Sequence, residues 1–169
     1  KIILGILIAL AAVYIAGCIY YSSHFYGVGT VFGISMRNQT AESLKEQIKQ
    51  KVGEYQIQID TRDGEETISA DQVGLEYDDQ GEIDQLLEDQ RTAAWFLMFT
   101  SSKEDRDIHM ILDENRLSDM VQGLSCMQEE NMTAPTDAHL EYVDGQFVIQ
   151  EETYGNQLEY NTVYTTIHD

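Results

Sequence analysis

The stretch Asp144–Tyr160, DGQFVIQEETYGNQLEY, decides how the chain is organised, because an earlier stretch has the same pattern of residues. The earlier stretch, Asp63–Asp79, reads DGEETISADQVGLEYDD and aligns with the later one at a constant separation of 81 residues. The glycines at the turns and breaks coincide in two pairs, Gly64 with Gly145 and Gly74 with Gly155. Apolar positions also fall on apolar positions, so the sequence predicts a duplicated unit.

Each copy predicts the same order of elements: a helix, a hairpin with an Asp-Gly turn, a glycine and a second helix. The helices show apolar residues three and four positions apart, and Asp-Gly is a favoured turn between two strands. For the first copy we predict a helix after the cap residue Thr40, strands at 55–59 and 67–73, and a helix over 82–99 capped by Asp78 or Asp79. For the second copy we predict a strand at 107–112, a helix over 114–127 capped by Asp113, and a hairpin at Asp144 and Gly145. The pattern indicates an α+β fold.

Before the first copy, Ile2–Tyr21 reads IILGILIALAAVYIAGCIYY and contains no charged residue. Twenty helical residues at about 1.5 Å each match the hydrocarbon core of a bilayer, about 30 Å thick. Lys1 precedes this span, and the next basic residue is Arg37, which favours an N-terminus inside the cell. We therefore predict a transmembrane signal-anchor helix over 1–22, an extended connecting segment over 23–39, and the duplicated domain over 40–169.

Two alternatives for this N-terminal segment stay open. A cleaved signal peptide has a shorter apolar core, of 7 to 15 residues, than the one present here. The tetrapeptide Ile15–Cys18, IAGC, resembles a bacterial lipobox, in which Cys18 would carry a lipid, although the residues after Cys18 remain apolar. Each alternative except a released signal peptide leaves the rest of the chain tethered to the outer face of the cell membrane.

The chain is strongly acidic, with a formal net charge of −20. All thirty acidic residues and nine of the ten basic residues follow Tyr21, so this outer part carries −21. Proteins bind nucleic acid by placing Lys and Arg on phosphates, and so we exclude nucleic acid as a partner.

The side chains capable of chemistry do not form a recognisable catalytic or metal-binding motif. Cys18 lies in the apolar span and Cys126 outside it, so the two cannot form a disulfide. Three weaker candidates are a Cys126–His109 dyad, a calcium site in the Asp60–Glu66 turn, and a carboxylate pair of Asp71 and Glu152. Base rates for free cysteine and the turn preference of Asp-Gly favour a structural role for each over catalysis or metal binding. We expect no catalytic residue, no metal and no cofactor. Trp95 is the sole tryptophan, and its apolar neighbours predict packing in a core together with Phe96 and Leu97.

Four stretches together resemble the N-terminal region of Gram-positive, membrane-anchored L,D-transpeptidases, which is described as a peptidoglycan-binding domain. They are GTVFGISMRNQTAESL (29–44), QIDTRDGEETISADQVGLEY (58–77), LLEDQRTAAWF (86–96) and TAPTDAHLEYVDGQFVIQEETYGNQLEY (133–160). Similar domains occur in the vancomycin B-type resistance protein family. The resemblance implies peptidoglycan as a partner, and it implies a catalytic domain with a Ser-His-Gly-Cys motif, which this sequence does not contain.

The sequence thus predicts a non-catalytic, extracellular peptidoglycan-binding stalk of an L,D-transpeptidase-like protein on a single-pass anchor. The alternative is a structural or partner-binding ectodomain of the resistance family. Because Asp169 falls where the second copy should enter its helix, we expect a truncated second copy and a longer natural protein. The candidate ligand-binding residues are Tyr142, Tyr154 and Tyr160, which gather in and after the second hairpin.

Overall fold

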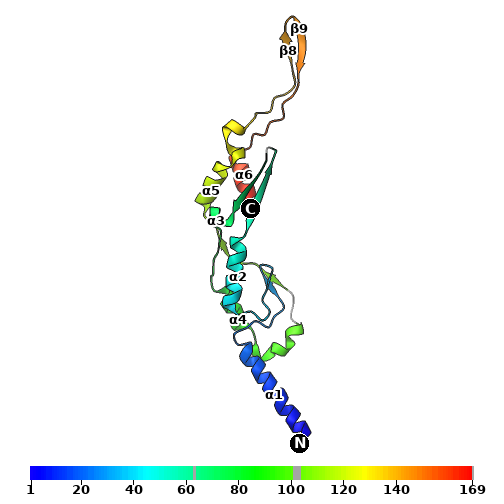
Figure 1. Ribbon diagram of the computed structural model, residues 1–169, viewed down its shortest axis with the longest axis vertical. Helices are drawn as coiled ribbons and strands as arrows, with labels where there is room; N and C mark the ends of the chain where they lie inside the picture. The colour runs from blue at the N-terminus through cyan, green and yellow to red at the C-terminus, as the bar shows by residue number, and fades with distance from the viewer. Residues whose placement is uncertain (63, 101–103, 169) are drawn as a thin grey trace. The chain divides into compact units, whose positions relative to one another are not determined.

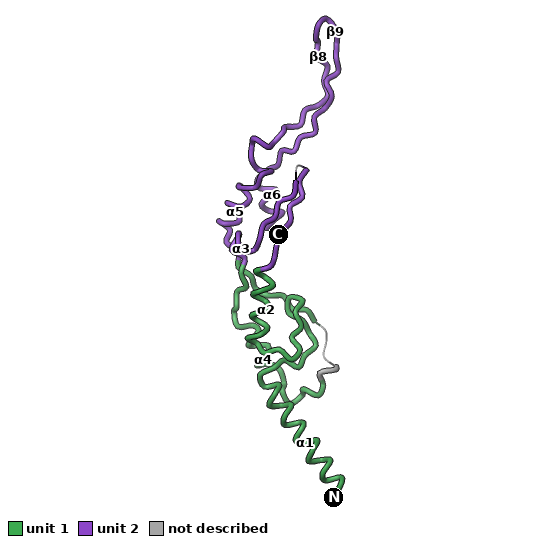
Figure 2. The backbone as a smooth tube through the Cα atoms, in the orientation of Figure 1, with its two compact units in different colours: residues 1–53, 76–111 green, residues 54–75, 112–169 purple. Residues whose placement is uncertain are grey.

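A computed structural model describes residues 1–62, 64–100 and 104–168. It contains helices and short strands, most of them paired antiparallel, which confirms the predicted α+β class (Figure 1). The chain divides into two compact units, coloured separately in Figure 2, and each is built from two separate segments. Unit 1 comprises residues 1–53 and 76–111, and unit 2 comprises residues 54–75 and 112–169.

Unit 1 begins with the apolar helix and continues with small sheets around one amphipathic helix. Its elements are α1 (Ile2–Tyr20), β1 (Thr30–Val31), β2 (Ile34–Ser35), α2 (Ala41–Gly53), β5 (Glu76–Tyr77), α4 (Glu82–Asp89), the 3-10 helix η1 (Thr92–Thr100), β6 (Asp105–Arg106) and β7 (Met110–Ile111). β1 pairs antiparallel with β2 and parallel with β6, while β5 pairs antiparallel with β7.

The core of unit 1 is formed by the apolar face of α2. Leu44, Ile48 and Val52 are buried there, as the spacing of four residues predicts. The Thr40 hydroxyl accepts a hydrogen bond from the Ser43 amide at 3.1 Å, which confirms the predicted helix cap. Ile83 of α4 is also buried, and α2 contacts both α4 and β5.

Unit 2 combines two hairpins with three helices. Its elements are β3 (Gln56–Thr61), β4 (Gly64–Ser69), α3 (Ala70–Val73), α5 (Glu114–Gly123), the 3-10 turns η2 (Ser125–Met127) and η3 (Glu129–Asn131), β8 (His139–Val143), β9 (Gln146–Gln150) and α6 (Tyr160–His168). β3 pairs with β4 and β8 with β9, both antiparallel.

The first hairpin is covered by the helix of the second predicted copy. Ile68 of β4 forms a buried cluster with Leu117 and Val121 of α5, and Ile167 of α6 packs against that cluster. Asp113 caps α5, because its carboxylate accepts hydrogen bonds from the backbone N–H groups of residues 115 and 116 at 3.0 and 3.1 Å.

Four predicted elements are corrected by the structure in their extent. The strand predicted over 67–73 ends at Ser69, because the Gln72 side chain accepts a hydrogen bond from the Ser69 amide at 2.8 Å and closes a helical turn. The strand predicted over 107–112 is reduced to Met110–Ile111, and the helix predicted to reach Met127 ends at Gly123. The fourth correction concerns the helix predicted over 82–99, and it changes which apolar residues of that stretch are buried.

That helix ends at Asp89, and the chain turns at Gln90 into η1. Gln90 is extended because its side-chain amide donates hydrogen bonds to the carbonyls of Tyr21 at 2.6 Å and His24 at 2.7 Å. The predicted burial of Phe96 and Leu97 is wrong, since these side chains are 54% and 48% exposed. The cap of the helix is Gly81, whose amide donates to the Asp79 carboxylate at 3.1 Å.

Candidate functional site

Unit 2 contains a groove of about 620 Å³, which is within the size range of small-ligand sites. One wall is strand β3 and the other is the segment from Gly155 into α6. The lining residues are Ile57, Gln58, Ile59, Asp60, Thr61, Arg62, Cys126, Gly155, Asn156, Gln157, Leu158, Thr162, Val163, Thr166 and Ile167. Strand alternation explains this wall, because Ile57 and Ile59 are half-buried on one face of β3 while Gln58 and Asp60 are exposed.

Arg62 joins the two walls. Its Nη1 donates hydrogen bonds to the carbonyl oxygens of Tyr154 and Gly155, both at 3.0 Å. Residues 154 and 155 lie outside the helices and strands. The Arg62 guanidinium therefore supplies hydrogen bonds to carbonyl oxygens that regular secondary structure does not pair. The groove is therefore held at one end by a contact between a hairpin turn and the connection into α6.

Gly155 is required by close packing rather than by a special backbone angle. A Cβ atom built there would lie 2.5 Å from the Pro135 nitrogen and 2.6 Å from the Thr133 carbonyl oxygen. Asn156 holds the same close approach, since its backbone N–H donates a hydrogen bond to the Thr133 carbonyl oxygen at 3.0 Å. The two segments of unit 2 that lead into and out of the second hairpin are thus in close contact at Gly155.

The lining chemistry suits binding rather than catalysis. An apolar floor of Ile and Val side chains is bordered by amides and hydroxyls, which recognise amide and hydroxyl groups on a ligand. Among the residues that the structure describes, no group of three His, Cys, Asp or Glu side chains is arranged to hold a metal. Asp63, in the turn considered for calcium, lies outside the described residues.

Cys126 lies at the boundary of the groove and a second hollow of about 480 Å³. Burial raises the pKa of the Cys126 thiol, and the neighbouring Glu66 carboxylate raises it further. The same carboxylate accepts hydrogen bonds from the Ser125 and Cys126 amides at 2.9 and 3.1 Å. A catalytic cysteine needs a lowered pKa, so this environment favours an inert thiol.

The other chemical candidates from the sequence have structural partners of their own. His109 Nδ1 lies 3.5 Å from the Glu82 carboxylate in unit 1, whereas Cys126 belongs to unit 2. The Asp71 carbonyl oxygen accepts a long hydrogen bond from Arg116, and the Glu152 carboxylate accepts one from the Tyr154 hydroxyl. These contacts give the His109 and Glu152 side chains structural roles, while the Asp71 contact involves only its backbone.

The second hairpin presents an apolar face to solvent. Leu140 pairs with Ile149, and Tyr142 pairs with Phe147 across the two strands, so all four side chains share one face. They are 67%, 70%, 64% and 73% exposed, and the Tyr142 and Phe147 rings lie 4.9 Å apart. The turn is the predicted one, with positive φ at Asp144 and Gly145, which a type I′ turn requires.

The three candidate tyrosines do not form one cluster. Tyr142 is on the hairpin, and Tyr154 is 75% exposed beside the Gly155 end of the groove. Tyr160 instead packs against the core of unit 2, where its hydroxyl makes a 2.8 Å hydrogen bond with Ser118. Of the candidate glycines, Gly74 has φ +63° and ends α3, while Gly64 pairs with Thr61 at the first turn. The duplication that relates these positions stays a prediction.

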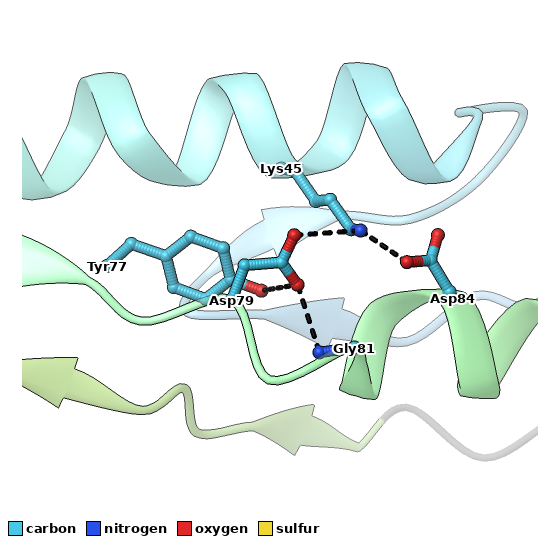
Figure 3. A network of polar contacts seen from close by, with 5 residues as sticks. All are labelled: Lys45, Tyr77, Asp79, Gly81 and Asp84. Atoms are coloured by element: carbon cyan, nitrogen blue, oxygen red, sulfur yellow. Dashed lines mark hydrogen bonds and ion pairs between the residues drawn. The ribbon is translucent and has the colours of Figure 1, made fainter.

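Unit 1 contains a polar network that sequence reasoning missed (Figure 3). The Lys45 ammonium lies 2.9 Å from the Asp79 carboxylate and also pairs with Asp84. The hydrogen bonds that Lys45 donates to Asp84 and Asp79 raise the pKa of Lys45, and the one that Asp79 accepts from Lys45 lowers the pKa of Asp79. Burial raises the pKa of Tyr77 to about 12, and the Asp79 charge adds to that effect. These pKa values move away from neutrality, so the network is an ionic clamp between α2 and α4.

The groove was also missed from the sequence, although the alternation in β3 and the apolar spacing in α6 were visible. No local signal brings those two elements together, since they are about a hundred positions apart.

Comparison with known families adds a separate finding. A family model described as "Putative peptidoglycan binding domain" matches residues 66–167, more than half of the chain. No curated protein and no solved structure matches.

Proposed function

The chain belongs to this peptidoglycan-binding family, and from that premise we propose that it is a non-catalytic module that binds peptidoglycan outside the cell membrane. The family match carries the proposal, because it contains the Gly155–Ile167 wall of the groove and the whole second hairpin. The other wall, strand β3, lies just before the matched segment.

The groove is the proposed site for the polymer. Peptidoglycan consists of amino sugars with N-acetyl groups and short peptide stems, so it offers amides, hydroxyls and small apolar groups. Gln157 and Thr166 are exposed polar groups on one wall, and Ile57 and Ile59 form the apolar part of the opposite wall.

The exposed tyrosines extend this surface in the proposal. Tyr154 directly precedes the groove residue Gly155 in the sequence, and Tyr142 with Phe147 offers an exposed aromatic pair on the hairpin. Aromatic rings present a large apolar surface at a low cost in side-chain entropy. Tyr160, which packs against the core, would act by supporting α6 rather than by touching the ligand.

Membrane anchoring is the second part of the proposal. Of the helices in the described chain, α1 alone is long and apolar enough to cross a bilayer, with a mean hydropathy of 2.8 and no buried residue. A single pass with Lys1 inside would place residues after Tyr21 outside. The formal charge of −21 on this outer part would keep it away from anionic lipid and anionic wall polymers except where short-range contacts hold it.

The full-length protein is proposed to be an L,D-transpeptidase-like cross-linking enzyme of a Gram-positive cell wall. The alternative is a vancomycin B-type resistance family protein whose ectodomain has no affinity for the wall. A Ser-His-Gly-Cys motif in any further coding sequence of the gene would support the enzyme and so separates the two.

Co-sedimentation of the whole chain with purified sacculi, stripped of teichoic acid and over a range of salt, tests wall binding. We expect saturable binding that persists at high salt, because screening removes only long-range charge effects. The groove variants Gln157→Ala and Thr166→Val should weaken it, while Gln85→Ala, an exposed residue of α4, should not. Absence of sedimentation with the wild-type chain would refute peptidoglycan binding.

A further inference from the structure

The 3-10 helix η1 lies against the C-terminal half of α1 (Figure 1). The Tyr14 hydroxyl donates a 2.9 Å hydrogen bond to the Ala93 carbonyl oxygen, and the Trp95 indole donates one of 3.3 Å to the Tyr14 carbonyl oxygen. The indole ring sits directly on Gly17, where any Cβ atom would overlap it. Because Gly17 has no side chain, the Trp95 ring has room to pack against the surface of α1.

The packed segment still exposes large apolar groups. Phe96 is 54% exposed and Leu97 is 48% exposed, and residues 92–100 include no charged side chain. On α1, Tyr14, whose ring faces Phe96, is 40% exposed, and Tyr20 is 45% exposed. Exposed apolar groups that continue an apolar helix form one patch, and such patches mark contact surfaces.

The position of Trp95 along α1 determines how deep this patch would lie in a bilayer that α1 spans. α1 is 19 residues long, about 28 Å at the helical rise, which is close to the thickness of the hydrocarbon core. Gly17 is three residues before the end of α1, so the indole lies about 5 Å inside that end. If α1 spans the membrane, its packing partner must enter the boundary between headgroups and acyl chains.

The side chains present there are those that bilayer interfaces favour. Tyrosine and tryptophan concentrate at this boundary, because their rings are apolar while their hydroxyl and indole N–H groups can hydrogen-bond. Tyr21 stacks on Trp95 with ring centroids 5.7 Å apart, and Tyr14 lies 6.4 Å from Phe96. A helical backbone also satisfies its own hydrogen bonds, as apolar surroundings require.

We propose that Thr92–Leu97, with the aromatic end of α1, forms a lipid-binding surface embedded in the outer leaflet. The inference rests on the membrane-anchoring part of the proposed function. The surface recognises the apolar interior of phospholipid rather than headgroup charge, since residues 92–97 carry no charge and the chain as a whole is acidic. Two contacts with the bilayer, the span and this segment, would restrict the tilt of unit 1.

Trp95 is the sole tryptophan, so its fluorescence tests the inference directly. The whole chain is reconstituted in phosphatidylcholine vesicles that carry bromine at defined acyl positions. We expect blue-shifted emission, strong quenching by bromine placed near the headgroup, and little quenching by aqueous iodide. Replacing part of the phosphatidylcholine with phosphatidylglycerol, or adding salt, should leave the quenching unchanged.

Two variants and one control identify the surface. Phe96→Ser should shift the Trp95 emission to the red and reduce bromine quenching, because an apolar contact with lipid is lost. Gly17→Leu should displace the indole from α1 and cause most of the quenching to disappear. Met110→Ser removes an apolar side chain that is 46% exposed elsewhere in unit 1, and it should change nothing.

Flotation and carbonate extraction of the same vesicles separate this inference from the anchor. A chain that resists extraction but whose Trp95 is quenched by iodide and not by bromine would overturn the lipid-binding surface and leave the anchor intact. A chain that is extracted by carbonate would overturn both. A chain that resists extraction and shows quenching by bromine near the headgroup supports both.

Discussion

Arg62 and Gly155 lie 93 residues apart in the sequence, and a 3.0 Å hydrogen bond joins the Arg62 guanidinium to the Gly155 carbonyl oxygen. The same nitrogen also donates to the Tyr154 carbonyl oxygen. This contact closes one end of the groove in unit 2 and connects a hairpin turn to the segment that leads into α6. Its partners are backbone atoms, so the hydrogen bond itself needs no side chain at position 155, where close packing leaves no room for one.

Replacing Arg62 by methionine should weaken binding to sacculi more than it weakens the fold. The two hydrogen bonds come from an exposed side chain, so their loss should cost about 1 kcal/mol of unfolding free energy. The groove would lose its closed end, and binding should fall. Co-sedimentation and urea unfolding measure the two effects, with Lys49→Met on the exposed face of α2 as a charge-matched control. Equal binding by the two variants would contradict a role for the groove.

Replacing Gly155 by alanine should destabilise unit 2. The new methyl group would lie 2.5 Å from Pro135, and overpacking of this kind costs about 1–3 kcal/mol. Thermal or urea unfolding of the variant measures the loss. Gly53→Ala is the control, because a Cβ atom at the end of α2 has no atom within 4 Å and alanine favours helix. Two variants of equal stability would mean that the Pro135 crossing can relax freely.

Replacing Lys45 by methionine should remove the ionic clamp of unit 1, at a cost of about 1–2 kcal/mol near neutral pH. The pKa of Lys45 is raised by folding, so its contribution is complete below its unfolded pKa of about 10.4 and is lost as pH rises through the folded value. The pKa of Asp79 is lowered, so its contribution is complete above about 3.9 and is lost as pH falls through the folded value.

The difference in unfolding free energy between the wild type and Lys45→Met should therefore be constant between about pH 5 and pH 9 and should shrink outside that range. Urea unfolding at a series of pH values measures it. Lys49→Met should show no such profile, since Lys49 is exposed on the same helix. A difference in unfolding free energy that grew under acidic conditions would contradict a stabilising ion pair between Lys45 and Asp79.

Cys126 should react slowly with iodoacetamide. Burial and the Glu66 carboxylate raise the thiol pKa, so the thiolate fraction at pH 8 is below that of an ordinary cysteine. The rate is best followed in a Cys18→Ser background, so that only Cys126 reports. Glu66→Gln should accelerate the reaction by removing the negative charge, and urea should accelerate it further. A native thiol that reacts faster than the denatured one would favour a nucleophilic role.

The local elements of unit 1 could be predicted because their causes lie within a few residues. Thr40 caps α2 through its own hydroxyl, and the spacing of Leu44, Ile48 and Val52 fixes which face is buried. The break after Asp89 was not predictable in this way. It depends on the side chain of Gln90 reaching the carbonyls of Tyr21 and His24, which are more than sixty residues earlier.

The candidate site shows the same division. The Asp144–Gly145 turn and the strands beside it follow from turn chemistry and alternation, and the structure contains them. The placement of the three tyrosines does not follow from sequence, because Tyr160 faces the Ser118 hydroxyl whereas Tyr142 and Tyr154 are exposed. Periodicity shows which residues share a face and leaves open what that face meets.

The sequence by itself determined the apolar first helix, the acidic character of the rest of the chain, the α+β class and the family to which the chain belongs. These properties are sums over neighbouring residues or matches along the chain, so they need no folding partner. Only the tertiary structure decided the two interleaved units, the groove closed by Arg62, the clamp around Lys45 and the docking of Trp95 on Gly17. Each of these depends on contacts between residues far apart in sequence. Such contacts stabilise the protein only after folding has brought their partners together.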